Sequence, residues 1–221
     1  MLNLLFPKVC NGCKNPLNST EKVLCVDCRH QLPLACHHRH GSSEMKNLFY
    51  GRCAIFQATA LLYFHKKGIT QELLHNLKYR GQHEISGFFG HWMGSELAEI
   101  QEYRDIDVVI PVPLHPSKRR KRGYNQVTGF GKAIAKHLQC TFREDLLLKI
   151  SKSKSQVFKT RFGRFSKDEV FSLSATACFS GQHILLVDDI VTTGATLEQC
   201  AHLIQQQPGV KLSLATIAIA S

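Results

Sequence analysis

Long apolar runs are missing from this chain. Its 221 residues contain no uninterrupted apolar stretch that approaches the roughly 18 residues of a membrane span. The first residues also lack a basic region followed by an apolar signal core. Acidic residues are scarce, with 17 Asp and Glu against 28 Lys and Arg, which gives a net charge of +11. These absences argue against membrane insertion and export, so we expect a basic protein of the cytoplasm.

The nine cysteines do not suggest a disulfide framework, because their number is odd and no signal sequence precedes them. Four of them instead have metal-ligand spacing. Cys10-x-x-Cys13 and Cys25-x-x-Cys28 form two knuckles separated by eleven residues, as in sites where four thiolates hold Zn²⁺. Four ligands leave no open position, so we predict a structural zinc. The alternative is a loop with four free cysteines.

A bound metal would supply folding energy that some forty residues cannot obtain from their own core. We therefore expect an N-terminal zinc-knuckle module over residues 1–50 and a larger domain over residues 51–221. A second metal site could form from the residues that follow the knuckles, namely Cys36, His37, His38, His40 and Cys53. Their spacing is irregular, and surface histidines with small core cysteines are the alternative.

Strand and helix patterns alternate through the rest of the chain. We predict strands within residues 54–64, 107–113, 146–150, 184–187 and 211–220, and helices within 69–78, 85–100, 127–138 and 197–206. In the first two helices the inward side chains are expected to be Leu73, Leu74, Leu77, Phe88, Trp92 and Leu97. Such alternation predicts an α/β fold with a mainly parallel sheet flanked by helices.

One stretch, HILLVDDIVTTGAT from His183 to Thr196, carries the clearest chemistry. Its apolar run is typical of a strand buried in a parallel sheet, and two carboxylates follow at the end where open α/β sheets bind ligands. A hydroxyl- and glycine-rich turn then leads into a helix, whose first N–H groups suit a phosphate. The two carboxylates suit ribose hydroxyls, with Mg²⁺ nearby to offset their charge.

The positive charge is concentrated in one segment. Between Ser117 and Lys167 there are fifteen Lys or Arg and two acids, so the residues outside this segment carry a net negative charge. Five of these cations are consecutive, from Lys118 to Arg122. Such a field suits pyrophosphate, a nucleotide or a nucleic-acid backbone. A solvated basic loop is the alternative. Residues 152–167 are basic and poor in aliphatic side chains, as in a mobile flap.

The sequence VDDIVTTGAT resembles the phosphoribosyl pyrophosphate (PRPP) motif of type I phosphoribosyltransferases. The resemblance implies that Asp188 and Asp189 hold the ribose hydroxyls, with Mg²⁺ accompanying PRPP. It also implies that the 5′-phosphate is held by Thr192, Thr193, Gly194, Ala195 and Thr196.

The likeness extends over nearly the whole chain. Paired CxxC knuckles, LKYRG at residues 77–81, PVPLHPSKRRKRGYNQ at 111–126 and the PRPP motif occur in the same order in the bacterial ComF family. These are amidophosphoribosyltransferase-like proteins that include the competence protein ComFC and GntX-like relatives. The resemblance implies a pyrophosphate loop with Arg119, Arg122 and Gln126. It also implies a flap with Gln156 and Arg164, although Lys167 stands where the family usually has asparagine.

The resemblance implies ribosyl transfer from PRPP with release of pyrophosphate, and a role in competence and DNA uptake alongside other competence-machinery proteins. The acceptor is not indicated, because no stretch suggests a nucleobase hood or a nucleophile for releasing ammonia from glutamine. The alternative is a protein that binds single-stranded DNA, in which PRPP is only a regulatory ligand or is not bound. A catalytically silent scaffold is a third possibility, although the intact acid pair argues against it. The sequence leaves the oligomeric state open.

Overall fold

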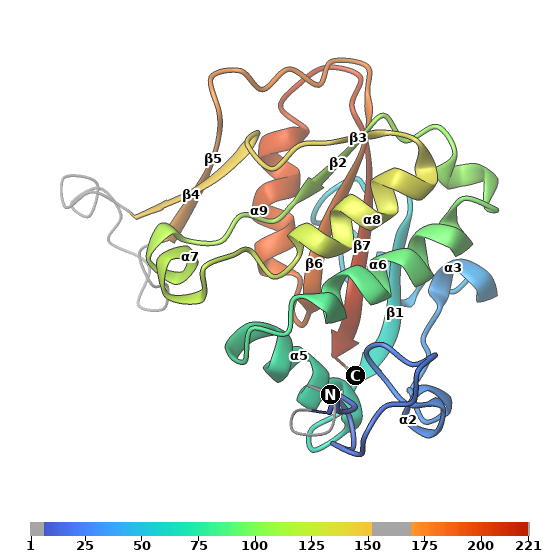
Figure 1. The fold of residues 1–221 in the computed structure, drawn as a ribbon. Helices are drawn as coiled ribbons and strands as arrows, with labels where there is room; N and C mark the ends of the chain where they lie inside the picture. Colours follow the sequence, from blue (N-terminus) through green and yellow to red (C-terminus); the bar gives the residue numbers. More distant parts are fainter. Residues whose placement is uncertain (1–6, 152–168, 221) are drawn as a thin grey trace.

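Five parallel strands form the main sheet of the protein. The structure is a computed structural model that describes residues 7–151 and 169–220 (Figure 1). The strand order is β1-β7-β6-β2-β3, and every neighbouring pair runs parallel. The strands are β1 Ala58–Phe64, β2 Val108–Pro111, β3 Thr141–Phe142, β6 His183–Val191 and β7 Lys211–Ala220. The predicted α/β fold with a mainly parallel sheet flanked by helices is therefore confirmed.

A separate antiparallel pair consists of β4 Leu147–Ser151 and β5 Glu169–Leu173. The sequence predicted β4 but not β5, whose EVFSL pattern is short and lies beside the basic segment. The expected flap over residues 152–167, including Gln156 and Arg164, lies outside the described residues.

The central strand β6 has apolar side chains on both faces, as expected for a strand inside a parallel sheet. Because successive side chains point to opposite faces, Ile184 and Leu186 join one buried cluster while Leu185 and Val187 join the other. All four are fully buried. The strand that carries the acid pair is thus held from both sides of the sheet.

Helices cover both faces of the sheet. One face carries α5 Ile69–Tyr79, α6 Glu84–Leu97 and α8 Thr128–Leu138, and the other carries α9 Ala195–Ile204 (Figure 1). The shorter helices are α2 Val26–His30, α3 His37–His40, α4 Glu44–Asn47, η1 Gln101–Tyr103 and α7 Pro116–Arg122. Helices α6 and α8 approach closely at Gly90, where a Cβ would lie 2.5 Å from the Phe130 carbonyl oxygen. No helix within the described ranges is long and apolar enough to cross a bilayer.

The inward face of α6 differs from the prediction. Leu97 is buried as expected, but Phe88 and Trp92 are only half-buried, and the core positions are taken by Ile85, Phe89 and Met93. Both faces of α6 are apolar, so periodicity alone could not distinguish the core face from the other.

A second difference concerns the basic run after β2. Lys118 to Arg122 lie in the short helix α7, which begins with Pro116 in its first turn and ends at Gly123, where φ is +80°. None of the residues of α7 is buried.

The N-terminal segment packs directly against the sheet and its helices. The Tyr63 N–H of β1 donates to the Pro33 carbonyl at 2.7 Å, and the Ala35 N–H donates to the Leu61 carbonyl at 2.9 Å. Val23, Leu24 and Leu32 belong to the same buried cluster as residues of α5 and α6. The knuckle region therefore shares a core with the larger domain.

Candidate functional site: an acid pair, a phosphate loop and a cation-lined pocket

The acid pair lies within β6, because the strand continues past it to Val191. The predicted strand ended at Val187. Backbone pairing with β7 persists beyond the acids, since Ile190 is in register with Ala218 and Val191 with Ile219. The carboxylates therefore sit on a rigid element rather than on a loop.

The turn after β6 presents an exposed loop at the start of α9. Thr192, Thr193, Ala195 and Thr196 are exposed, whereas Gly194 is buried and caps the helix with φ +77°. A Cβ at Gly194 would lie 2.9 Å from Cε1 of the buried Phe49 ring. Glycine is thus required both by the left-handed backbone and by this close approach.

Arg52 braces this loop from the N-terminal half of the chain. Its guanidinium donates to the Thr193 carbonyl at 2.8 Å and to the Leu48 carbonyl at 2.9 Å, and it forms an ion pair with Glu198 in the first turn of α9. The guanidinium also donates a hydrogen bond to Glu198 within this ion pair, which raises the pKa of Arg52. Arg52 was not among the predicted site residues, because no local sequence pattern reveals a contact between residues 141 positions apart.

Asp189 is almost fully buried and has two partners from distant parts of the chain. Its Oδ1 lies 3.1 Å from Lys78 Nζ, and its Oδ2 accepts a hydrogen bond from Gln126 Nε2 at 2.8 Å. Gln126 Oε1 in turn accepts from Arg122 Nη1 at 2.9 Å. The structure thus connects two of the predicted basic-loop residues, Arg122 and Gln126, to the acid pair.

Asp188 is in a different electrostatic environment. Its Oδ1 accepts a hydrogen bond from the Asp189 N–H at 2.8 Å. Burial of the carboxyl group and the neighbouring charge of Asp189 raise the pKa of Asp188 to about 8, against the favourable effect of Lys78 and Lys149. A bound cation or a hydroxyl donor would therefore stabilise the charged form of the Asp188 carboxyl group.

A cation-lined pocket has a volume of about 320 Å³. Lys78 and Arg122, both tied to the Asp189 network, contribute to its wall. The full lining is Lys78, Tyr79, Gly81, Lys118, Lys121, Arg122 and Tyr124. Four of these seven side chains are cationic and none is acidic, so the pocket favours an anion.

The pocket is built from the two motifs LKYRG and RGYNQ. The Tyr124 hydroxyl donates to the Leu77 carbonyl at the end of α5, and the Arg122 guanidinium lies 5.1 Å from the centre of the Tyr79 ring. These contacts hold the turn after α7 against the turn after α5. Arg119, the third predicted basic-loop residue, is not part of this arrangement. It faces Glu144 at 3.4 Å and lines another cavity.

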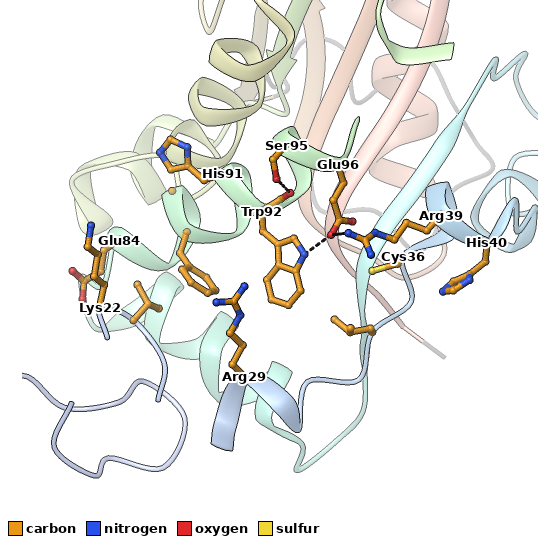
Figure 2. Close-up of a pocket in the computed structure, with 14 residues that line it drawn as sticks. Lys22, Arg29, Cys36, Arg39, His40, Glu84, His91, Trp92, Ser95 and Glu96 are labelled. Atoms are coloured by element: carbon orange, nitrogen blue, oxygen red, sulfur yellow. Dashed lines mark hydrogen bonds and ion pairs between the residues drawn. The ribbon is translucent and has the colours of Figure 1, made fainter. Parts of the chain in front are cut away.

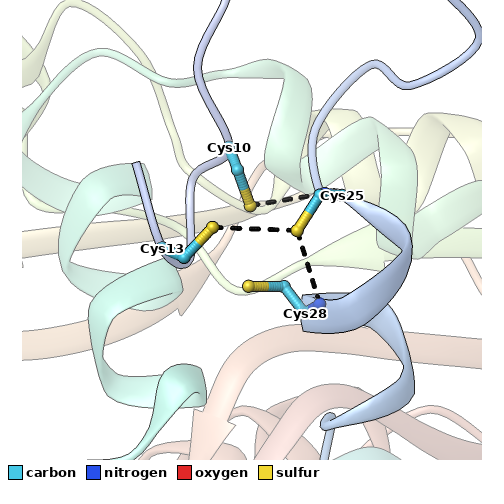
Figure 3. A group of neighbouring side chains, drawn as sticks. All are labelled: Cys10, Cys13, Cys25 and Cys28. Atoms are coloured by element: carbon cyan, nitrogen blue, oxygen red, sulfur yellow. Dashed lines mark hydrogen bonds between the residues drawn. The ribbon is translucent and has the colours of Figure 1, made fainter. Parts of the chain in front are cut away.

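The four predicted zinc ligands come together in the N-terminal segment (Figure 3). The sulfur atoms of Cys10, Cys13, Cys25 and Cys28 all lie within 4.8 Å of one another. Cys13 Sγ and Cys25 Sγ are 3.7 Å apart, close to the roughly 3.8 Å that a tetrahedral site with Zn–S bonds of about 2.3 Å requires.

Backbone amides also point at these sulfurs. Cys10 Sγ accepts from the N–H groups of Gly12 and Cys25, both at 3.3 Å, and Cys25 Sγ accepts from the Cys28 N–H at 3.5 Å. Donors of this kind stabilise thiolates, and hydrogen bonds from Cys25, Cys13 and Gly12 lower the pKa of Cys10 to about 7 against the effect of burial. The donor set and its surroundings fit a structural Zn²⁺.

Known proteins resemble this chain over most of its length. DNA utilization protein YhgH of Escherichia coli O157:H7 is 25% identical over 204 residues, which cover 89% of this chain and 83% of that protein. Competence protein ComFC of Bacillus subtilis (strain 168) is 25% identical over 208 residues, which cover 93% of this chain and 82% of that protein.

Residues 128–219 of this chain match the phosphoribosyl transferase domain model. The matched range contains the acid pair and the loop at the start of α9, while Lys78, Arg122 and Gln126 precede it. Among solved structures, the purine phosphoribosyltransferase from Pyrococcus horikoshii Ot3 is 15% identical, with a TM-score of 0.39, and covers 61% of this chain and 73% of its own.

Proposed function

We propose that this chain binds PRPP and transfers its ribosyl group to an acceptor, with release of pyrophosphate. The observation that carries the proposal is the hydrogen-bonded path from Asp189 through Gln126 to Arg122, since it joins the acid pair to the cation-lined pocket. A ligand with hydroxyl groups at one end and a pyrophosphate at the other matches both parts of the site.

In this proposal the 5′-phosphate binds at the turn from Thr192 to Thr196. The N-terminus of α9 presents backbone N–H groups and the positive end of a helix dipole, and three exposed threonine hydroxyls add further donors. Gly194 lets the backbone turn tightly, and Arg52 holds the loop from behind through the Thr193 carbonyl. The phosphate would thus meet a loop that is already ordered.

The acid pair would accept hydrogen bonds from the two ribose hydroxyls. A positive charge bound close to Asp188 would lower the raised pKa of this carboxyl group. Carboxylate oxygens fit Mg²⁺, and Asp188 and Asp189 would hold it together with the oxygens of PRPP; when bound, the ion would polarise the pyrophosphate and stabilise its departure.

The remaining residues would act by position and charge. As the bond to pyrophosphate breaks, positive charge develops on the ribose ring and negative charge on the leaving group. Lys78, Lys121 and Arg122 would stabilise the leaving group, while the carboxylates hold the ring in place. Lys78 also contacts Asp189, so it is shared between the two halves of the site.

Release of pyrophosphate that requires both PRPP and an acceptor tests the transfer step. We expect one or more acceptors from a panel of nucleobases, amines and ammonia to give turnover, and Lys121→Gln to lower it at least tenfold. Lys66→Gln, which removes an exposed lysine in the turn after β1, should leave the rate unchanged. Protein that binds PRPP yet releases no pyrophosphate with any acceptor would contradict transfer and favour a regulatory role for PRPP.

A second function, binding of single-stranded DNA, is favoured by helix α7. Lys118, Arg119, Arg120 and Lys121 are all exposed, and no side chain of this helix is buried in the core. The relatives named for DNA utilization and competence support the same role. Backbone contacts of this kind weaken steeply with salt.

We expect single-stranded DNA affinity to fall linearly with salt on logarithmic axes, and Arg120→Gln to reduce the slope. Asp188→Asn should leave the affinity for single-stranded DNA unchanged, because Asp188 belongs to the proposed PRPP site. Affinity that does not vary with salt would contradict a phosphate-binding surface on α7.

The wider organisation follows from these proposals. We propose that residues 1–50 form a zinc-knuckle module attached to a phosphoribosyltransferase-like domain over residues 51–221, and that proteins of the competence machinery are its partners. Since the four-cysteine site needs reduced thiols, we place its work in the cytoplasm.

A further inference from the structure

Another cavity lies between the N-terminal segment and α6, and neither residue of the acid pair lines it (Figure 2). Its volume is about 1040 Å³. Trp92 and Phe88, the two aromatic side chains of α6 that do not enter the core, form part of its wall, and the Arg29 guanidinium lies 4.9 Å from the centre of the Trp92 ring. Cys36 and Glu96 line the same cavity.

Three potential metal ligands meet at this wall. One ligand atom each from Cys36, His38 and Glu96 lies within 4.8 Å of the other two. Cys36 and His38 come from the segment at the start of α3, whereas Glu96 belongs to the last turn of α6. The side chains are well enclosed, with His38 at 0% and Glu96 at 9% exposure.

The backbone at Cys36 is in an unusual conformation. Its φ of +39° and ψ of +48° lie in the left-handed region, which is unfavourable for a non-glycine residue. Such strain persists where the surroundings fix a side chain in a particular place. At Cys36 it directs a thiol into the group formed with His38 and Glu96.

Hydrogen bonds from residues outside the cluster orient His38 and Glu96. His38 Nδ1 lies 2.7 Å from Thr59 Oγ1, so Nε2 is the ring nitrogen that faces the cluster. Glu96 uses one oxygen, Oε1, to accept hydrogen bonds from Trp92 at 2.6 Å and Arg39 at 2.5 Å. Its other oxygen, Oε2, faces His38 Nε2 at 2.6 Å. Histidine ligands of metals are oriented in this way by a hydrogen bond at the second nitrogen.

We propose that Cys36 Sγ, His38 Nε2 and Glu96 Oε2 bind a second Zn²⁺. One thiolate, one imidazole and one carboxylate form a donor set suited to zinc, and the two negative ligands neutralise the ion. Nitrogen and oxygen ligands at about 2.0–2.1 Å from zinc lie roughly 3.3 Å apart in a tetrahedron. His38 and Glu96 would therefore separate by less than about 1 Å to admit the ion.

This site differs from the four-cysteine site in its coordination. Three protein ligands leave a fourth position, and the cavity beside Cys36 and Glu96 gives water or a small donor ligand access to it. The ion would also fasten the N-terminal segment to α6. Cys53, which the sequence analysis grouped with these residues, is not in the cluster; its thiol lies near Arg52 and Glu198 instead.

Zinc content of the purified full chain, dialysed against buffer with a slight excess of Zn²⁺ and then desalted, tests the proposal. We expect two zinc ions per wild-type chain, and a fall to one in both Cys36→Ser and Glu96→Gln. Two matched controls, Cys53→Ser and His40→Gln, should retain two, since His40 lines the same cavity outside the cluster. When Co²⁺ replaces Zn²⁺, the thiolate-to-metal absorption of Cys36→Ser should be lower than that of the wild type by the contribution of one sulfur ligand.

Wild-type chain that holds a single zinc under these conditions would overturn the proposal, whether or not the variants fold. So would variants with normal circular dichroism that still hold two ions, because the second ion would then be bound elsewhere, for example on exposed histidines.

Discussion

Replacement of Gly194 by alanine is the perturbation whose size follows most directly from the structure. The residue has φ +77°, and a left-handed conformation costs an L-residue about 1–2 kcal/mol. The new Cβ would also lie 2.9 Å and 3.1 Å from two ring atoms of Phe49. Because Phe49 is only 1% exposed, its ring has little room to withdraw, and overpacking of this kind costs about 1–3 kcal/mol. Gly194→Ala should therefore lower the free energy of unfolding by about 2–5 kcal/mol.

Guanidinium unfolding followed by circular dichroism measures this loss. Gly87→Ala is the matched control, since a Cβ at this helical glycine of α6 meets nothing within 4 Å. It should stabilise the protein by about 0.5–1 kcal/mol. In a Phe49→Leu background the clash is relieved while the backbone strain remains, so the further cost of Gly194→Ala should fall to about 1–2 kcal/mol. A Gly194→Ala protein as stable as the wild type would show that neither the left-handed backbone nor the Phe49 ring disfavours a side chain at this position.

Three further predictions follow from particular contacts. Gln126→Leu removes the amide that donates to Asp189 and accepts from Arg122, so PRPP affinity measured by calorimetry should fall at least about tenfold, equivalent to about 1.4 kcal/mol. The control Gln199→Leu, on the exposed side of α9, should have no effect. Equal PRPP affinities of Gln126→Leu and the wild type would argue against the network. Removal of zinc from the four-cysteine site by a chelator should lower the melting temperature. It should also change the fluorescence emission of Trp92, the only tryptophan, because Arg29 of α2 stacks on its ring. Unchanged emission would show that α2 stays in place without metal. Burial lowers the pKa of His183 in the folded protein, so the unfolded chain binds a proton at a higher pH than the folded one. The free energy of unfolding should therefore decrease as the pH falls below about 6.5, and level off once His183 is protonated in the folded protein too. His183→Asn should lack this component in urea unfolding at several pH values, and an identical pH profile would rule out His183 as its source.

The parts of the fold with strong local periodicity could be predicted from the sequence. The run from Ile184 to Val187 is apolar on both faces, which is enough to place it inside a parallel sheet. The two CxxC knuckles likewise give their four ligands by spacing alone. Helix α7 was harder, because its five consecutive cations have no apolar periodicity, and only Pro116 and Gly123 mark its ends.

The candidate site was predictable where its residues are adjacent in sequence. Asp188, Asp189 and the loop that follows lie in one motif, and Arg122 and Gln126 in another. The contacts of Lys78 with Asp189, of Arg52 with Thr193 and of Glu96 with His38 join residues far apart in the chain. A single sequence has no signal for such pairs, since each depends on how the elements pack.

The packing of α6 explains why its core face was wrongly predicted. Phe88 and Phe89 are adjacent aromatic residues, and only the packing against α8 decides that Phe89 enters the core. Phe88 and Trp92 then remain available to line the large cavity. Adjacent apolar residues on a helix point in different directions, so the packing decides which of the two is more deeply buried.

We propose that the acid pair and the loop before α9 bind PRPP. The first experiment is therefore calorimetric titration of PRPP with Mg²⁺ into the zinc-loaded protein, alongside the Asp188→Asn, Asp189→Asn double variant. Asp145→Asn is the matched control, because this exposed carboxylate pairs with Arg143 outside the site. We predict binding that requires Mg²⁺, is lost in the double variant and is retained in the control. Absence of PRPP binding to the folded wild-type protein, or equal binding by the double variant, would contradict the account.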